Sequence, residues 1–211
     1  MKKQEKIEHA EKEKEERQAS YFIYAIVFIV IFIALIFSIR YFFPAKQEIQ
    51  QYSYNGFIFT NIGGLWYTEI LKEGTNKSYS VPLHFSPSEL GNVTIEGDVN
   101  AFKNKTEIFL TFDPNAEEFS YIALSASEVS INLAQTLNIT PIAACTSNET
   151  PACTGRLVVD CKNPGPPAIY FSYSNYTRVY VQNNCIFVQG FRQELVRATD
   201  RLLLKWFSIM P

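Results

Sequence analysis

The chain has 211 residues, with 19 Lys and Arg against 21 Asp and Glu, which gives a formal net charge of −2 at neutral pH. A charge so close to balance excludes a strongly basic protein, and we expect no nucleic-acid partner because phosphate recognition relies on clustered Lys and Arg. About 155 residues follow an apolar segment and a short stalk near the N-terminus, which is enough for one domain with a single core.

Residues 1–20 form a charged head that consists largely of Lys, Glu and Gln. Two pairs, Glu8 with Lys12 and Glu13 with Arg17, have the spacing and order that stabilise a helix. Because acidic residues match the basic ones, the head is a poor lipid-binding patch. We interpret it as a solvated cytoplasmic helix that fixes topology, and docking to a cytoplasmic partner is the alternative.

The next segment, residues 21–39, contains no charged residue. As a helix with about 1.5 Å of rise per residue, it would be about 28 Å long, close to the thickness of a bilayer core. Aromatic residues stand at both ends, where they favour the membrane interfaces. The apolar run is longer than that of a signal peptide, and no small-residue cleavage site follows it. The sequence therefore predicts a retained transmembrane helix over residues 21–43.

Charge on the two sides of this segment predicts its orientation. Six Lys and Arg residues precede it and only Arg40 and Lys46 follow closely, so the N-terminus should be cytoplasmic and the C-terminal part extracytoplasmic. All four cysteines lie in the C-terminal part, which agrees with an oxidising exterior. The same part holds six N-glycosylation sequons, at Asn76, Asn92, Asn104, Asn138, Asn148 and Asn175. We expect a single-pass protein of the cell membrane, with the lipid bilayer and other membrane or envelope proteins as partners.

Residues 44–55 are predicted to form a polar stalk, and residues 56–211 a single extracytoplasmic domain. The strand-like and helix-like patterns of this domain predict a mixed α+β or α/β fold, with one mixed β-sheet backed by two helices. In the first half of the domain, strand-like runs at residues 57–60 and 65–70 predict a hairpin, and two more runs lie at residues 80–85 and 93–96. Pro82 cannot donate a backbone hydrogen bond, so the run at 80–85 is expected at the edge of a sheet.

The middle of the domain predicts a βαβ unit with parallel strands. A nearly continuous apolar run at 107–112 is typical of a strand that is covered on both faces. Helical spacing follows, and then a second apolar run at 139–144. Glu128 is the one interior charge on the expected outer face of this helix. Its inner stripe comprises Ile122, Ala126, Val129, Leu133 and Leu137.

Short strand-like runs between residues 157 and 188, parted by Asn, Gly and Pro, predict hairpins. A final helix is expected over residues 193–208. Its inner side would carry Leu195, Thr199, Leu202 or Leu203, and Trp206. A basic row of Arg197, Arg201 and Lys205, with Glu194 and Asp200 interleaved, is expected on a solvated face, and an anion site is the alternative.

The four cysteines are Cys145, Cys153, Cys161 and Cys185. They lack the closely spaced pairs of a structural zinc site, and no histidine is near, so we expect disulfides and no metal. Four cysteines allow three connectivities. We favour Cys145–Cys153 with Cys161–Cys185, each bond adding about 2–4 kcal/mol of stability.

Motifs for catalysis are missing from the sequence. No nucleotide-binding glycine loop or zinc-protease motif occurs, and we predict neither catalytic residues nor a cofactor. His84 is the single histidine of the C-terminal part, which excludes a multi-histidine zinc site. Ligands of open α/β sheets bind at the carboxyl ends of parallel strands. The residues expected there, as ligands for a cation or a sugar, are Asp113, Thr146, Ser147, Glu149 and Asp160. Ordinary loop and helix-start chemistry is the alternative for Asp113.

Three segments carry a resemblance to known proteins: PIAACTSNETPAC at 141–153, NCIFVQG at 184–190, and ELVRATDRLLLKWFSIM at 194–210. They resemble segments of uncharacterised single-pass archaeal membrane proteins, mainly over residues 105–211. The resemblance implies an archaeal cell surface, where N-glycosylation and an oxidising exterior are both possible. That family supplies no assigned activity and no catalytic residue to carry over.

Three classes of function follow from these patterns. The first is a membrane-anchored cell-surface protein with a structural or protein-interaction role. The second is an envelope enzyme or ligand-binding module that uses the acidic residues near Asp113. The third is a pilin-like filament subunit, which is disfavoured because the acid-rich head has no clear processing site. The sequence leaves the oligomeric state open.

Overall fold

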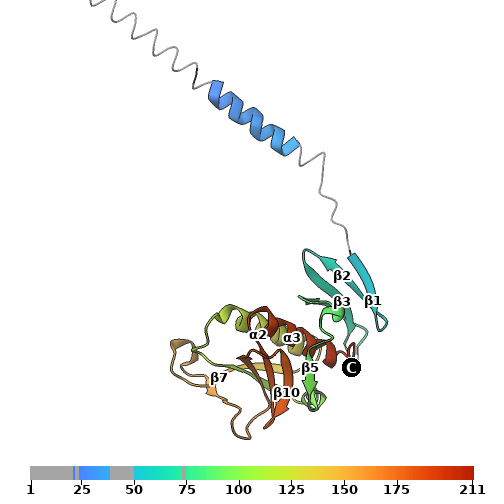
Figure 1. The fold of residues 1–211 in the computed structure, drawn as a ribbon, viewed down its shortest axis with the longest axis vertical. Coiled ribbons are helices and arrows are strands. Elements are labelled where there is room, and N and C mark those ends of the chain that lie inside the picture. Colours follow the sequence, from blue (N-terminus) through green and yellow to red (C-terminus); the bar gives the residue numbers. More distant parts are fainter. Residues whose placement is uncertain (1–20, 22–23, 39–49, 73–74) are drawn as a thin grey trace, which may run out of the picture. The chain divides into compact units, whose positions relative to one another are not determined.

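The computed structural model describes residues 21, 24–38, 50–72 and 75–211 (Figure 1). The chain divides into two compact units, Met1–Glu48 and Ile49–Pro211. The described residues contain two β-sheets and three α-helices, which confirms a mixed α+β fold. The first unit holds one of the helices, and the second unit holds both sheets and the other two helices.

In the first unit, residues 24–38 are helical, and their large apolar side chains are exposed. Among the described residues, no helix combines the length and the apolar composition needed to cross a membrane. The charged head and the predicted stalk up to residue 49 lie outside the described residues. So do residues 22–23 and 39–43 of the predicted span.

A four-stranded antiparallel sheet opens the second unit. Its strands are β1 (Gln50–Tyr54), β2 (Phe57–Ile62), β3 (Leu65–Leu71) and β4 (Ser78–Leu83), paired in that order. The predicted hairpin is confirmed as β2–β3, and Gly63 and Gly64 turn it with φ of +62° and +87°, the left-handed region that a two-residue turn requires. Pro82 lies in edge strand β4, as predicted. Residues 50–54, expected in the stalk, instead pair with β2.

The second sheet has seven strands in the order β5-β10-β11-β9-β6-β7-β8. Strands β6, β7, β8, β9 and β11 run parallel, whereas β10 is antiparallel to β11 and carries β5 at the edge. The strands are β5 (Thr94–Glu96), β6 (Glu107–Phe112), β7 (Thr140–Cys145), β8 (Leu157–Val158), β9 (Ala168–Tyr173), β10 (Arg178–Gln182) and β11 (Cys185–Gly190). The expectation of one mixed sheet is therefore wrong. Local hairpins pair β1 to β4 with one another, and periodicity does not report which sheet a strand joins.

Two helices pack on one face of the seven-stranded sheet (Figure 1). They are α2 (Phe119–Gln135), which connects β6 to β7, and α3 (Gln193–Trp206). The parallel pairing of β6 with β7 across α2 is confirmed. Short 3-10 helices lie at η1 (Pro87–Glu89), η2 (Val99–Phe102) and η3 (Pro151–Cys153). The expected inner residues of α3 are buried: Leu195, Thr199, Leu202, Leu203 and Trp206.

The expected solvated face of α3 is wrong for two charged residues, because Asp200 and Arg201 are buried. The reason is that α3 is covered on a second side. Asp200 accepts hydrogen bonds from the chain that follows β4, and the carbonyl of Ile209, just beyond α3, accepts one from Asn55 in the β1–β2 turn. A single apolar stripe is typical of a helix that packs on one neighbour, whereas α3 packs on the seven-stranded sheet and α2 and also contacts the chain that follows β4.

The faces of the seven-stranded sheet bury different clusters. On the helix side, residues such as Ile169, Phe171 and Ile186 join a core that continues under the four-stranded sheet. On the opposite side lies a smaller cluster of Ala144, Val159, Cys161, Ala168 and Cys185. The segment after β8 supplies two of these residues, so it covers that side of the sheet in place of a helix.

Candidate functional site

Both favoured disulfides are present, Cys145–Cys153 and Cys161–Cys185. All four cysteines of the chain are thereby bonded. The first closes the loop after β7, and the second ties the segment after β8 to the start of β11. The loop after β7 and the segment after β8 are therefore held by covalent bonds in addition to hydrogen bonds.

The five residues predicted to gather at strand ends lie around one hollow. Asp113 follows β6, Asp160 follows β8, and the other three follow β7. Because these strands are parallel, their carboxyl ends meet at one edge of the sheet. The hollow has a volume of about 630 Å³, and Asp113, Thr146, Ser147, Glu149 and Asp160 all line it. Whether it binds a ligand stays a prediction.

Hydrogen bonds hold the acidic residues of this strand-end cavity. Asp113 Oδ1 accepts the backbone N–H of Asn115 at 2.9 Å, and the amide of Asn115 donates to Glu149 Oε2 at 2.9 Å. Asp160 Oδ1 accepts the backbone N–H of Lys162 at 3.1 Å. The loop chemistry considered for Asp113 is thus present, but Asp113 does not cap a helix, because α2 begins only at Phe119. Asn115 links the loops after β6 and β7.

The sequence did not predict the aromatic part of the cavity. Tyr170 on β9 and Phe187 on β11 line it, with ring centres 5.4 Å apart. Burial raises the pKa of Tyr170, and the negative charges of Asp113 and Asp160 raise it further, so its hydroxyl remains a hydrogen-bond donor at neutral pH. Strand alternation separates Tyr170 from its buried neighbours Ile169 and Phe171, but it does not tell which face meets the loops.

The composition of the cavity suits a polar, uncharged or cationic ligand. Three carboxyl groups face a single ammonium group, that of Lys162, among its lining side chains. Amide side chains of Asn115, Gln182 and Asn183 add donors and acceptors next to the aromatic rings. Carboxyl, amide and aromatic groups together can bind a sugar, and the carboxyl groups alone can attract a cation.

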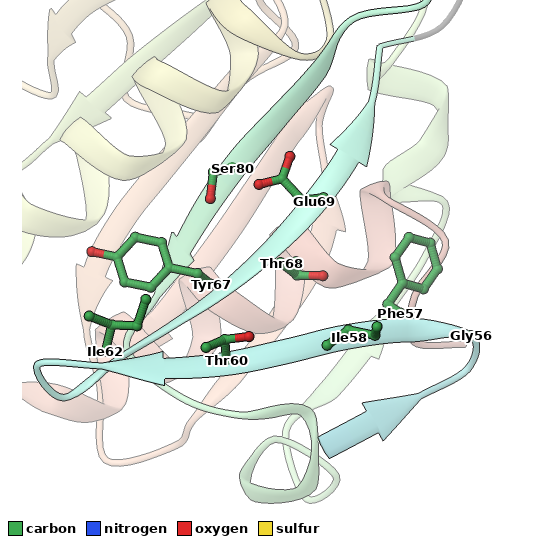
Figure 2. Close-up of a pocket in the computed structure, with 9 residues that line it drawn as sticks. All are labelled: Gly56, Phe57, Ile58, Thr60, Ile62, Tyr67, Thr68, Glu69 and Ser80. Carbon is green, nitrogen blue, oxygen red and sulfur yellow. The ribbon is translucent and has the colours of Figure 1, made fainter. Parts of the chain in front are cut away.

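A second hollow lies on the outer face of the four-stranded sheet, among residues of β2, β3 and β4 (Figure 2). Its volume is about 640 Å³. The register places Thr60 beside Tyr67 and Glu69 beside Ser80, and strand alternation adds two isoleucines to this face. These are Ile58 and Ile62, which are 63% and 50% exposed. The face is thus less polar than a solvated sheet face normally is.

A third group of polar side chains lies inside the second unit. The Oδ2 atom of Asp200 on α3 accepts the backbone N–H groups of His84 and Phe85, both at 2.8 Å. Glu128 Oε1 on α2 lies 2.6 Å from His84 Nδ1. Burial, together with nearby negative charge, raises the pKa of Glu128 and of Asp200, and burial lowers the pKa of His84.

The sequence placed Glu128 on the outer face of this helix, and the structure shows that the prediction is wrong. Glu128 is buried together with Ser125 and Asn132 on the same helix face. These polar residues are three and four positions apart, so they share one face of the helix, and only one of them is charged. This pattern could have indicated a buried polar stripe. For Asp200 the signal was a second stripe, since Val196 and Leu204, four residues before and after it, are both buried.

In comparisons with known proteins, no family model, no curated protein and no solved structure matches the chain. The resemblance to archaeal membrane proteins stays a prediction. The chemistry of the strand-end cavity, the outer sheet face and the buried carboxyl groups is what bears on function.

Proposed function

We propose that the chain is a single-pass membrane protein whose disulfide-bonded second unit lies outside the cytoplasm and has a structural or protein-interaction role. The uncharged segment at 21–39 supports the anchor, and the excess of Lys and Arg before it supports the orientation. Two disulfides are consistent with an oxidising compartment.

Surface exposure of the sequons supports the same orientation. All six asparagines are exposed, namely Asn76, Asn92, Asn104, Asn138, Asn148 and Asn175. A glycan needs such exposure because it is bulky and hydrated. Glycosidase treatment of the protein from its native membrane should increase its electrophoretic mobility, and protease added to sealed cells should remove the second unit. A second unit that resists protease until the cells are opened would contradict the orientation.

The observation that carries the interaction role is the outer face of the four-stranded sheet. Ile58 and Ile62 are 63% and 50% exposed and line the hollow of Figure 2, and Leu71, which is 71% exposed, lies further along β3 on the same face. Exposed apolar groups that gather around a hollow are typical of protein-binding surfaces. The partner we propose is another membrane or envelope protein that places an apolar side chain there.

Photo-crosslinking in native membranes tests this role. A photoreactive residue in place of Ile62 should form a specific adduct with a second protein, and Ile58→Lys should abolish that adduct. The matched control is the same probe at Glu96, which is exposed on an edge strand of the other sheet. Equal adducts from both probe positions, or no adduct from the probe at Ile62, would contradict the role of this face.

A ligand-binding module is the second candidate, because one cavity collects the five residues expected at strand ends. A ligand that binds only the folded state raises the melting temperature. We expect such a rise with a sugar or a cation, and its loss when Asp113→Asn is combined with Glu149→Gln. Glu96→Gln is the control outside the cavity. Melting temperatures that no sugar or cation changes would contradict this candidate.

A further inference from the structure

Three side chains from separate parts of the second unit converge in its interior. His84 follows β4, Glu128 lies on α2, and Asp200 lies on α3. One potential metal-ligand atom from each lies within 4.8 Å of the others. The group therefore joins the end of the four-stranded sheet to both helices of the other layer.

Each of the three side chains has a buried polar atom without a hydrogen-bond partner among the described residues: His84 Nδ1, Glu128 Oε2 and Asp200 Oδ1. Asp200 is the most demanding case, because it is 0% exposed and only its Oδ2 atom is satisfied. The contact of 2.6 Å between His84 Nδ1 and Glu128 Oε1 is close, but it lacks the alignment of a hydrogen bond. Buried polar atoms of this kind call for an ion, a proton or a water molecule.

Charge and burial at this group suit a cation. A neutral imidazole is the form that binds metals, and burial lowers the pKa of His84. Glu128 and Asp200 are both buried, so two ionised carboxylates at this place would need a compensating positive charge. A divalent cation would balance both charges and use all three unpartnered atoms.

We propose that His84, Glu128 and Asp200 form a binding site for a divalent transition-metal ion of the Zn²⁺ type. One imidazole with two carboxylates suits such an ion, whereas Ca²⁺ and Mg²⁺ prefer oxygen ligands alone. The side chain of His84 is 33% exposed, which provides a route for the ion and for a coordinating water molecule. A bound ion would link the chain after β4 to α2 and α3 through its three ligands, and would thereby stabilise the packing of the two sheets.

The composition of the chain makes this site easy to test. All four cysteines are in disulfides, and the chain has only two histidines, His84 and His9 in the charged head. His9→Gln is therefore a matched control for His84→Gln. Glu117→Gln is the control for Glu128→Gln, because Glu117 is exposed just before the same helix.

The experiment is a Zn²⁺ titration of the full chain in detergent after removal of metal by EDTA, followed by thermal unfolding and by metal analysis. We expect one Zn²⁺ per chain and, at about 100 times the dissociation constant, a rise in melting temperature of about 5–10 °C. His9→Gln and Glu117→Gln should keep the rise, and His84→Gln and Glu128→Gln should lose it.

Glu128→Gln keeps the proposal falsifiable if His84→Gln does not fold, because an amide replaces a protonated carboxyl group of the same shape. Absence of a rise in the wild-type protein, or a full rise in Glu128→Gln, would overturn the proposal in favour of carboxyl groups that share protons. An equal rise with Ca²⁺ would overturn the assignment to a transition metal. None of these three outcomes bears on the proposed membrane orientation or on the proposed interaction face.

Discussion

Two groups of carboxyl side chains in the second unit have opposite surroundings. Glu128 and Asp200 extend from helices into the packed interior, whereas Asp113, Glu149 and Asp160 stand on loops after parallel strands. In the interior, burial raises the pKa of both carboxyl groups, so that a proton or a cation must accompany them at neutral pH. Whether an acidic side chain needs a proton or a cation at neutral pH is therefore decided by its surroundings in the fold and not by its residue type.

The two groups also differ in what they hold together. Asp200 accepts two backbone N–H groups from a segment more than one hundred residues earlier, at the junction of the two sheets. Asp113 and Asp160 each accept a backbone N–H group two residues ahead, which shapes only their own loops. Substitution in the interior should therefore affect the whole unit, and substitution at the strand ends should affect the cavity alone.

The largest effect is expected from Asp200→Ala. Two buried N–H groups lose their acceptor, so the free energy of unfolding should fall by about 3–5 kcal/mol. Urea unfolding of the full chain in detergent with EDTA measures the change, and Asp113→Ala is the comparison from the loop group. A loss below about 1 kcal/mol for Asp200→Ala would mean that water replaces the carboxyl group.

A somewhat smaller effect is expected from pH. The folded pKa values of Glu128 and Asp200 are raised above the unfolded ones, so their stabilising contribution is complete below about pH 4 and is lost as pH rises toward the folded values. Between pH 5 and 8 the metal-free protein should lose about 2–4 kcal/mol of stability. Glu128→Gln should flatten this slope, and Glu117→Gln should not. Calorimetry in EDTA across this pH range measures it, and a slope that is unchanged in Glu128→Gln would refute the assignment.

Local patterns predicted the parts of the fold that depend on neighbours in sequence. The turn glycines Gly63 and Gly64 indicated the β2–β3 hairpin, and the spacing of apolar residues indicated α2 between two parallel strands. Both disulfides followed from the short polar loop after Cys145 and from the later strand that carries Cys185. Parallel pairing then placed the five strand-end residues around one cavity.

The same local patterns did not predict contacts between elements that are distant in sequence. The chain passes from the four-stranded to the seven-stranded sheet between β4 and β5, where η1 lies. The spacing of apolar residues does not indicate this change of sheet. The burial of Asp200 and Glu128 accompanies their contacts with the segment after β4, which the spacing of residues within each helix does not reveal. Tyr170 and Phe187 were not predicted to line the cavity, because the sequence does not tell which face of a strand meets a loop.

A third prediction separates the two groups through the disulfide at the cavity. The double substitution Cys145→Ser with Cys153→Ser opens the loop that carries Thr146, Ser147 and Glu149, and should lower stability by about 2–3 kcal/mol. The pH slope of the interior pair should persist, because the two helices are untouched. Urea unfolding at pH 5 and pH 8 provides both numbers. A slope that disappears with the disulfide would mean that the two groups are energetically coupled.

The smallest effect is expected from Asp113→Asn. The new amide oxygen can still accept the N–H of Asn115, so the loop keeps its turn, and the free energy of unfolding should change by less than about 0.5 kcal/mol. The measurement is the melting temperature with and without sugars and cations, with Asp200→Asn as the interior counterpart. Asp200→Asn should lower the melting temperature under every condition, because its amide would bring two buried N–H donors to the place of Oδ1, which has no hydrogen-bond partner among the described residues. If Asp113→Asn lowered it as much, Asp113 would be a structural residue, and the strand-end cavity would lose the feature that separates it from the interior.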